Sequence, residues 1–235
     1  MPSTPEDHLS GFVVAIDGPS GSGKSSVSKQ VARTLGYGYL DTGAMYRALT
    51  WWCLREGVDL TDPDAITAAA ERLPLSIGTD PDDPTVTVDG VDVTADIRET
   101  RISTNVSAVA SVIPVRELMR VLQRRLISDA GSADGGVVAE GRDITTVVTP
   151  DAPVRILLTA SEEARLARRS TELHGAADEA SVAATRSQIV DRDKADSAVS
   201  EFSVAADGVT TIDTSHLDFG GSVEAVLQVV GAARA

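Results

Sequence analysis

A glycine-rich segment between a short apolar run and an amphipathic run constrains this chain most. Residues Gly18 to Ser25 read Gly-Pro-Ser-Gly-Ser-Gly-Lys-Ser, which matches the pattern of a glycine, any four residues and then Gly-Lys-Ser. In this pattern, successive backbone N–H groups surround a phosphate, and the glycines let the backbone wrap closely around it. The segment therefore predicts a loop that holds the phosphates of a nucleoside triphosphate.

The flanks of this segment supply the context that such a loop needs. Phe12 to Asp17 is mostly apolar, as expected of a strand buried on both faces. In Lys24 to Leu35 the apolar residues recur every four positions, and Gly36 follows as a stop signal. We expect Lys24 to reach the β- and γ-phosphates and Ser25 to offer its hydroxyl to Mg²⁺. The predicted residues for the phosphate donor are Gly18, Pro19, Ser20, Gly21, Ser22, Gly23, Lys24, Ser25 and Ser26.

Three more apolar runs are strand candidates and indicate a parallel central sheet. Helical periodicity occurs in Val115 to Ile127, whose predicted inner face carries Val115, Leu118, Met119, Leu122 and Leu126. Glu162 to Asp196 is also helical in character, with an interruption at His174-Gly175, and Gly221 to Ala235 closes the chain as a helix. The strand candidates are Gly136 to Glu140, Val154 to Thr159 and Val209 to Asp213.

The stretch from Pro63 to Ile97 differs from its surroundings. It contains four prolines and two runs with alternating residues, and Asp89-Gly90 is a typical hairpin turn. We therefore predict a small β-rich insert in a single α/β domain.

Composition narrows the range of partners. With 42% hydrophobic and 24% charged residues in 235, the chain is typical of one globular domain. A net charge of −14 argues against nucleic acid or an anionic membrane as partner, because both require a basic surface. The polar N-terminus, the lack of a run of about 18 apolar residues and the single Cys53 favour a cytoplasmic protein.

Triphosphate binding is shared by several classes of protein. The guanine motif N-K-x-D and the switch motif D-x-x-G of regulatory GTPases are both absent from the sequence. A motor ATPase usually has a long apolar strand that ends in Asp-Glu, whereas this chain offers Val137 to Glu140. Small phosphoryl-transfer kinases remain, and they need a second anion site for the acceptor. Asp41 to Arg47, Asp-Thr-Gly-Ala-Met-Tyr-Arg, has suitable parts, although a plain helix start is equally compatible with it.

Four motifs together resemble the bacterial cytidylate kinase family. They are GPSGSGKSS, DTGAMYR, EGRDITTVV and RDKADS, and they occur in the family's order and spacing from about Phe12 to the C-terminus. The resemblance implies a three-layer P-loop kinase fold and an enzyme of pyrimidine nucleotide metabolism. It implies ATP as donor with Mg²⁺, and CMP or dCMP as acceptor, with UMP as a further candidate. A monomer is expected.

The resemblance also assigns roles to single residues. The acceptor phosphate is assigned to Thr42, Arg47 and Arg142, the cytosine to Ser107, Arg116 and Asp143, and the ribose to Arg192 and Asp196. Residues 162–196 become a lid whose arginines stabilise the transferring phosphoryl group, and the residues assigned to catalysis are Lys24, Arg165, Arg169 and Arg192. Each has a structural alternative: a buried helix serine for Ser107, a helix cap for Asp196, and an exposed basic helix face for Arg165, Arg168 and Arg169.

The expected division is a core of residues 11–62, 98–161 and 197–235, an insert of 63–97 and a lid of 162–196. One position departs from the family, which commonly continues R-D-x-x-D-S-x-R where this chain has Val199. A slower or weaker-binding enzyme is the expected consequence. The alternatives are a kinase for another small acceptor, such as shikimate or gluconate, and a catalytically impaired nucleotide-binding protein.

Overall fold

The computed structural model describes residues 9–174, 186, 193–194, 197, 200 and 202–235. Three positions singled out from the sequence, Arg192, Asp196 and Val199, lie outside these described residues, as does most of the segment between 174 and 200.

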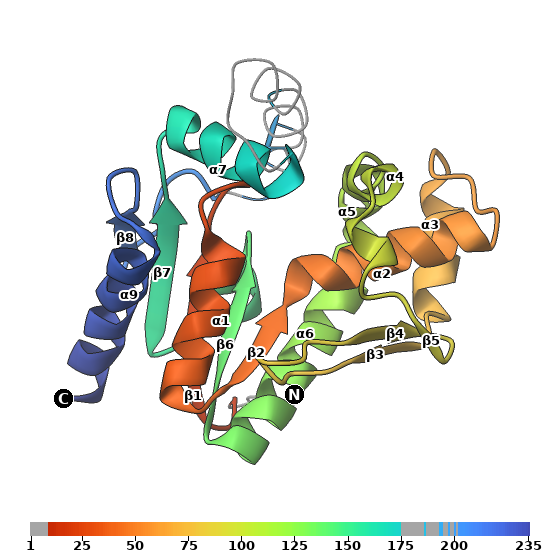
Figure 1. Cartoon of the computed structure of the whole chain (residues 1–235). Helices are drawn as coiled ribbons and strands as arrows, with labels where there is room; N and C mark the ends of the chain where they lie inside the picture. Colours follow the sequence, from red (N-terminus) through yellow and green to blue (C-terminus); the bar gives the residue numbers. More distant parts are fainter. Residues whose placement is uncertain (1–8, 175–185, 187–192, 195–196, 198–199, 201) are drawn as a thin grey trace.

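A five-stranded parallel sheet forms the centre of the molecule (Figure 1). Its strand order is β2-β6-β1-β7-β8, so β1 lies in the middle and pairs with β6 on one side and β7 on the other. The strands are β1 (Phe12–Asp17), β2 (Gly38–Asp41), β6 (Gly136–Gly141), β7 (Val154–Thr159) and β8 (Thr210–Asp213).

Different helices cover the two faces of this sheet. Val14 and Ile16 of β1 pack with α1 (Lys24–Leu35) and α9 (Phe219–Arg234). Val13 and Ala15 pack on the opposite face with α2 (Thr42–Arg55) and α6 (Ile113–Asp134). This alternation follows from the two-residue period of a strand. The arrangement confirms the predicted three-layer α/β fold with a parallel central sheet.

The strand β2 was not predicted from the sequence. It has only four residues, Gly-Tyr-Leu-Asp, and lies between two helices. Its pairing with β6 buries Tyr39 and Leu40 almost completely. Tertiary pairing, rather than a long apolar run, therefore makes this segment a strand.

Helix α6 is longer than the predicted Val115 to Ile127, and its inner face is different. Val115, Met119, Gln123 and Ile127 are buried along one row, whereas Leu118 is 37% exposed. The prediction that Leu118 faces the core is wrong, because the buried row follows a spacing of four and leaves Leu118 at its edge.

The insert begins with a helix, so the β-rich prediction is wrong for its first nine residues. In α3 (Pro63–Glu71), Pro63 occupies the first turn, where its missing N–H costs nothing. The Asp62 carboxylate caps this helix by accepting hydrogen bonds from the N–H groups of Asp64 and Ala65.

The rest of the insert is an antiparallel sheet of β3 (Leu75–Ile77), β4 (Val86–Val88) and β5 (Val91–Asp92). Asp89 and Gly90 have φ values of 51° and 73°, which fit the predicted two-residue hairpin turn. Three short helices then lead back towards α6: η1 (Asp96–Arg98), α4 (Thr100–Ser103) and α5 (Val106–Ala110).

Two further elements lie near the carboxyl ends of the strands. The turn η2 (Ile144–Val148) follows β6, and α7 (Glu162–His174) follows β7. Figure 1 shows α7 above the sheet, on the same side as the loop between β1 and α1.

Candidate active site

The loop from Gly18 to Gly23 connects the end of β1 to the start of α1. Gly23 has a φ of 85° and precedes the first turn of the helix, a conformation that favours glycine. A Cβ on Gly18 would lie 2.2 Å from the carbonyl oxygen of Leu158 on β7, so only glycine fits there. The structure thus places the predicted phosphate loop at the amino end of a helix, where backbone N–H groups favour an anion.

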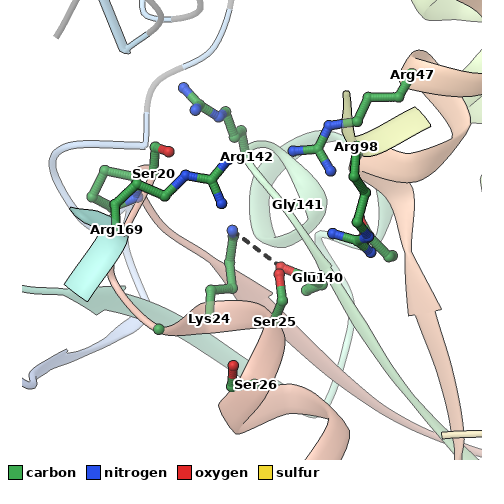
Figure 2. A pocket seen from close by; sticks show the side chains of 15 residues that line it. Ser20, Lys24, Ser25, Ser26, Arg47, Arg98, Glu140, Gly141, Arg142 and Arg169 are labelled. Atoms are coloured by element: carbon green, nitrogen blue, oxygen red, sulfur yellow. Dashed lines mark hydrogen bonds and ion pairs between the residues drawn. The ribbon is translucent and has the colours of Figure 1, made fainter. Parts of the chain in front are cut away.

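An open pocket lies over this loop and contains five basic side chains (Figure 2). Because the chain carries a net charge of −14, this concentration of positive charge marks a binding site for a multiply charged anion. The pocket is lined by Pro19, Ser20, Gly21, Gly23, Lys24, Ser25, Ser26, Asp41, Gly43, Arg47, Arg98, Glu140, Gly141, Arg142 and Arg169. Of the residues predicted for the donor, Gly18 and Ser22 do not line it.

Lys24 is held by a buried carboxylate at the end of β6. Its Nζ lies 3.0 Å from Oε2 of Glu140, as the dashed line in Figure 2 marks, and Tyr39 donates a hydrogen bond of 2.9 Å to Oε1. Burial, together with the neighbouring Glu140 and Asp41 charges, raises the pKa of the Tyr39 hydroxyl well above its usual value. Glu140 was not predicted as a site residue, because only Arg142 and Asp143 of the motif EGRDITTVV received a role.

Arg98 is a second residue that the sequence analysis missed. It comes from η1, directly after the insert of residues 63–97, and forms an ion pair of 3.4 Å with Oδ2 of Asp41. Oδ1 of Asp41 caps α2 by accepting from the Ala44 N–H. Burial alone would raise the pKa of Asp41, but the charges of Arg47, Arg98 and Lys24 outweigh it and lower this pKa. The Asp41 carboxylate therefore stays ionised among the cations of the pocket.

A second pocket adjoins the first and shares Gly43, Gly141 and Arg142 with it. In its wall, Arg116 of α6 donates hydrogen bonds to Oδ2 of Asp143 and, over 2.8 Å, to Oγ of Ser200. Burial raises the pKa of Asp143, although the charge of Arg116 opposes this. The lining is Thr42, Gly43, Tyr46, Val106, Ala110, Arg116, Gly141, Arg142, Asp143 and Ser200.

Thr42 and Ser107 differ in how they lie relative to the second pocket. Thr42 lines the second pocket, and its hydroxyl donates a hydrogen bond of 2.7 Å to the carbonyl oxygen of Glu140. Ser107 lies on α5 beside the lining residue Val106 but does not itself line either pocket.

The arginines of α7 differ in what they contact. Arg169 lines the first pocket, and Arg165 donates a hydrogen bond of 2.9 Å to the carbonyl oxygen of Ser20 in the phosphate loop. Arg168 instead donates to the carbonyl oxygens of Ser22 and Thr214, which joins the loop to the end of β8. These contacts rule out the alternative of a freely exposed basic face for Arg165 and Arg168.

Arg142 lies between the two pockets and is held from two directions. Its guanidinium lies 4.5 Å from the ring centroid of Phe202 and forms an ion pair of 3.0 Å with Asp193. Asp193 also pairs with Arg165 and accepts a hydrogen bond from the Ser20 N–H. The sequence analysis assigned no role to Phe202 or Asp193, because nothing local in the sequence brings them to Arg142.

A parallel sheet with helices on both faces, a phosphate loop after its central strand and two adjoining pockets that contain arginines define a protein with the P-loop kinase fold. The family model for cytidylate kinase matches residues 14–232. The chain belongs to the cytidylate kinase family.

Individual relatives agree over almost the whole chain. A cytidylate kinase of Streptomyces avermitilis is 52% identical over 224 residues, covering 95% of this chain and 94% of the relative. A cytidylate kinase of Rhodococcus opacus is 51% identical and covers 94% of this chain and 95% of its own length. The crystal structure of a sugar kinase from a Janibacter species is more distant, with 15% identity, a TM-score of 0.43 and coverage of 94% and 95% of the two chains.

Two features are absent from the part of the chain that the structure describes. They contain no group of three or more His, Cys, Asp or Glu side chains that could hold a metal ion. Among the described helices, none has the length and apolarity needed to cross a membrane.

Proposed function

We propose that this protein transfers the γ-phosphoryl group of ATP to CMP or dCMP, giving ADP and the cytidine diphosphate, with UMP as a further candidate acceptor. The observation that carries the proposal is the pair of adjoining pockets joined by Arg142, in a chain of the cytidylate kinase family. A donor and an acceptor bound in these pockets would meet beside that arginine.

The first pocket suits the donor triphosphate. Backbone N–H groups of the loop and the amino end of α1 would hold the phosphates, and Lys24 would place its charge against them. The oxygen donors near the loop fit Mg²⁺, which prefers one or two protein oxygens together with phosphate and water. Ser25 would be its protein ligand, and the ion would neutralise charge that develops on the phosphates.

The second pocket suits the cytidine monophosphate. The Asp143 carboxylate can accept from the exocyclic amine of cytosine, while Arg116 can donate to the ring oxygen or nitrogen. Arg47 and Arg142 would hold the acceptor phosphate, with Thr42 beside them, and Ser107 keeps its assignment near the base. Arg192 and Asp196 remain the proposed ribose contacts.

Phosphoryl transfer needs positioned charge more than it needs a strong base. Arg165 and Arg169 of α7, with Arg192, are proposed to surround the transferring group as a lid. Two observations support this role: Arg169 lines the first pocket, and Arg165 donates a hydrogen bond to the carbonyl oxygen of Ser20. We therefore keep the division into a core, an insert of residues 63–97 and a lid of 162–196. We also propose that the protein is a cytoplasmic monomer.

A coupled assay of ADP release tests the proposal with CMP, dCMP, UMP, AMP and GMP as acceptors. We expect kcat/KM to be highest for CMP or dCMP, and to depend on Mg²⁺. Equal rates for all five nucleotides, or a preference for a purine acceptor, would overturn it. Binding of ATP and CMP without turnover would favour the impaired nucleotide-binding protein suggested by Val199.

A further inference from the structure

Asp17 is a buried carboxylate at the carboxyl end of β1, directly before the phosphate loop. Only 2% of its surface is exposed, and it lines neither pocket. Burying a carboxylate costs free energy unless hydrogen bonds replace its lost water, so the hydrogen bonds of Asp17 indicate what this side chain does.

All three hydrogen bonds of the Asp17 side chain go to the start of η2. Oδ1 accepts from the Ile144 N–H at 2.9 Å, and Oδ2 accepts from the Thr145 N–H at 2.8 Å and the Thr145 hydroxyl at 2.6 Å. These two residues directly follow Arg142 and Asp143. Asp17 therefore caps the turn that directly follows Arg142 and Asp143, two of the residues proposed for the acceptor.

The sheet does not hold this turn by itself. The parallel ladder between β1 and β6 ends with the pairing of Asp17 and Gly141, so Arg142 and Asp143 lie beyond the last paired residue. The phosphate loop likewise begins beyond the last paired residue of its strand, but the hydrogen bonds of the Asp17 side chain go to η2 and not to this loop. The acceptor turn thus depends on the Asp17 carboxylate more than the phosphate loop does.

We propose that Asp17 is a positioning residue that fixes Arg142 and Asp143 relative to the phosphate loop, and so sets the acceptor against the donor. The proposal rests on the proposed function, because that function assigns Arg142 and Asp143 to the acceptor. Asp17 acts through these residues and touches neither nucleotide.

The substitution Asp17→Asn tests this at nearly constant shape. An amide has one oxygen, so in either orientation its NH₂ group faces a backbone N–H of Ile144 or Thr145 and that donor loses its acceptor. We expect the KM for CMP to rise about tenfold or more, while the KM for ATP changes by less than about threefold. Steady-state kinetics with each substrate varied in turn measure both constants.

A graded pair at the partner residue gives an independent measurement. Thr145→Val removes only the side-chain donor, so a smaller rise in the KM for CMP is expected, about threefold. Thr145→Ser restores the hydroxyl and should return this KM to the wild-type value. If Asp17→Asn does not fold, the two Thr145 variants test the proposal in its place.

Val230→Ala controls for a loss of stability alone. Val230 is 1% exposed in the packing of α9, on the sheet face opposite α6. Its truncation should lower the melting temperature and leave both KM values unchanged.

If Asp17→Asn raises both KM values equally, or changes neither, or if Thr145→Val leaves the KM for CMP unchanged, the positioning role is wrong. If instead the wild-type protein shows no cytidine preference, the proposed function fails, and that result is read from the wild type alone.

Discussion

Lys24 and Glu140 form an ion pair of 3.0 Å that joins the phosphate loop to the end of β6. The Glu140 side chain is 2% exposed and that of Lys24 is 14% exposed, so solvent screens this pair only weakly. Glu140 therefore holds the Lys24 ammonium at the floor of the donor pocket, beside Ser25 (Figure 2).

Glu140→Gln should lower kcat by about tenfold or more, because Lys24 loses the charge that orients it. The KM for CMP should change by less than about threefold, since Glu140 does not line the acceptor pocket. Tyr39→Phe is the matched control, because it removes the other hydrogen bond to Glu140 and keeps the charge. Steady-state kinetics decide the matter, and a wild-type kcat for Glu140→Gln would contradict the role given to this pair.

Asp143→Asn should reduce the discrimination between CMP and UMP. The carboxylate can accept from the amine of cytosine, whereas an amide can also donate to the oxygen that uracil carries in its place. We expect kcat/KM for CMP to fall by about 10- to 100-fold, and that for UMP to fall less.

Ser200→Ala is the control for Asp143→Asn, because Ser200 accepts from the same nitrogen of Arg116 as Asp143 does. Ser200→Ala should change kcat/KM only slightly, and by the same factor for CMP and UMP. An equal loss for CMP and UMP in Asp143→Asn would show that Asp143 only supports Arg116.

Phe202→Leu should raise the KM for CMP by about fivefold. The substitution removes the aromatic face under Arg142, a contact worth about 1 kcal/mol, and keeps most of the apolar volume. Phe219→Leu makes the same chemical change at a side chain that is 53% exposed at the start of α9 and should leave the KM unchanged. If both variants behave alike, the ring does not position Arg142.

Much of the fold followed from local sequence signals. The central strands β1 and β7 are buried and are therefore mostly apolar in sequence, with Arg155 as the one charged residue inside β7, and α1 shows its four-residue spacing clearly. The helix α3 was missed because the four prolines of the insert and the alternation that follows the helix suggested strands, although Asp62-Pro63 is a helix start.

The candidate site could be predicted only where a motif carries it. Seven of the fifteen residues that line the first pocket lie between Pro19 and Ser26, and that segment was recognised from its motif. Arg98 reaches the site from η1, whereas Asp193 and Phe202 come from positions about a hundred residues later, so only the folded structure brings them together. Tyr39 and Lys24 both contact Glu140, although Glu140 follows each of them by about a hundred positions in the sequence. Only the folded structure therefore indicates a role for Glu140.

The stability of the protein should also depend on Asp17. Burial raises its pKa from 3.8 to about 6, against the hydrogen bonds from Thr145 and Ile144, and the charge of Asp143 adds a smaller increase. Between pH 3.8 and about 6, the folded protein binds more protons at Asp17 than the unfolded chain does. The contribution of Asp17 to the free energy of unfolding is therefore largest below pH 4 and declines as the pH rises through 6. A difference of about two pKa units corresponds to about 3 kcal/mol. Because other carboxylates titrate in the same range, the measurement is the difference in the free energy of unfolding between wild type and Asp17→Asn, from urea denaturation at pH 4 to 7. We expect the advantage of the wild type to shrink by about 3 kcal/mol over this range, and an advantage that grows with pH would show that the hydrogen bonds to Asp17 outweigh its burial.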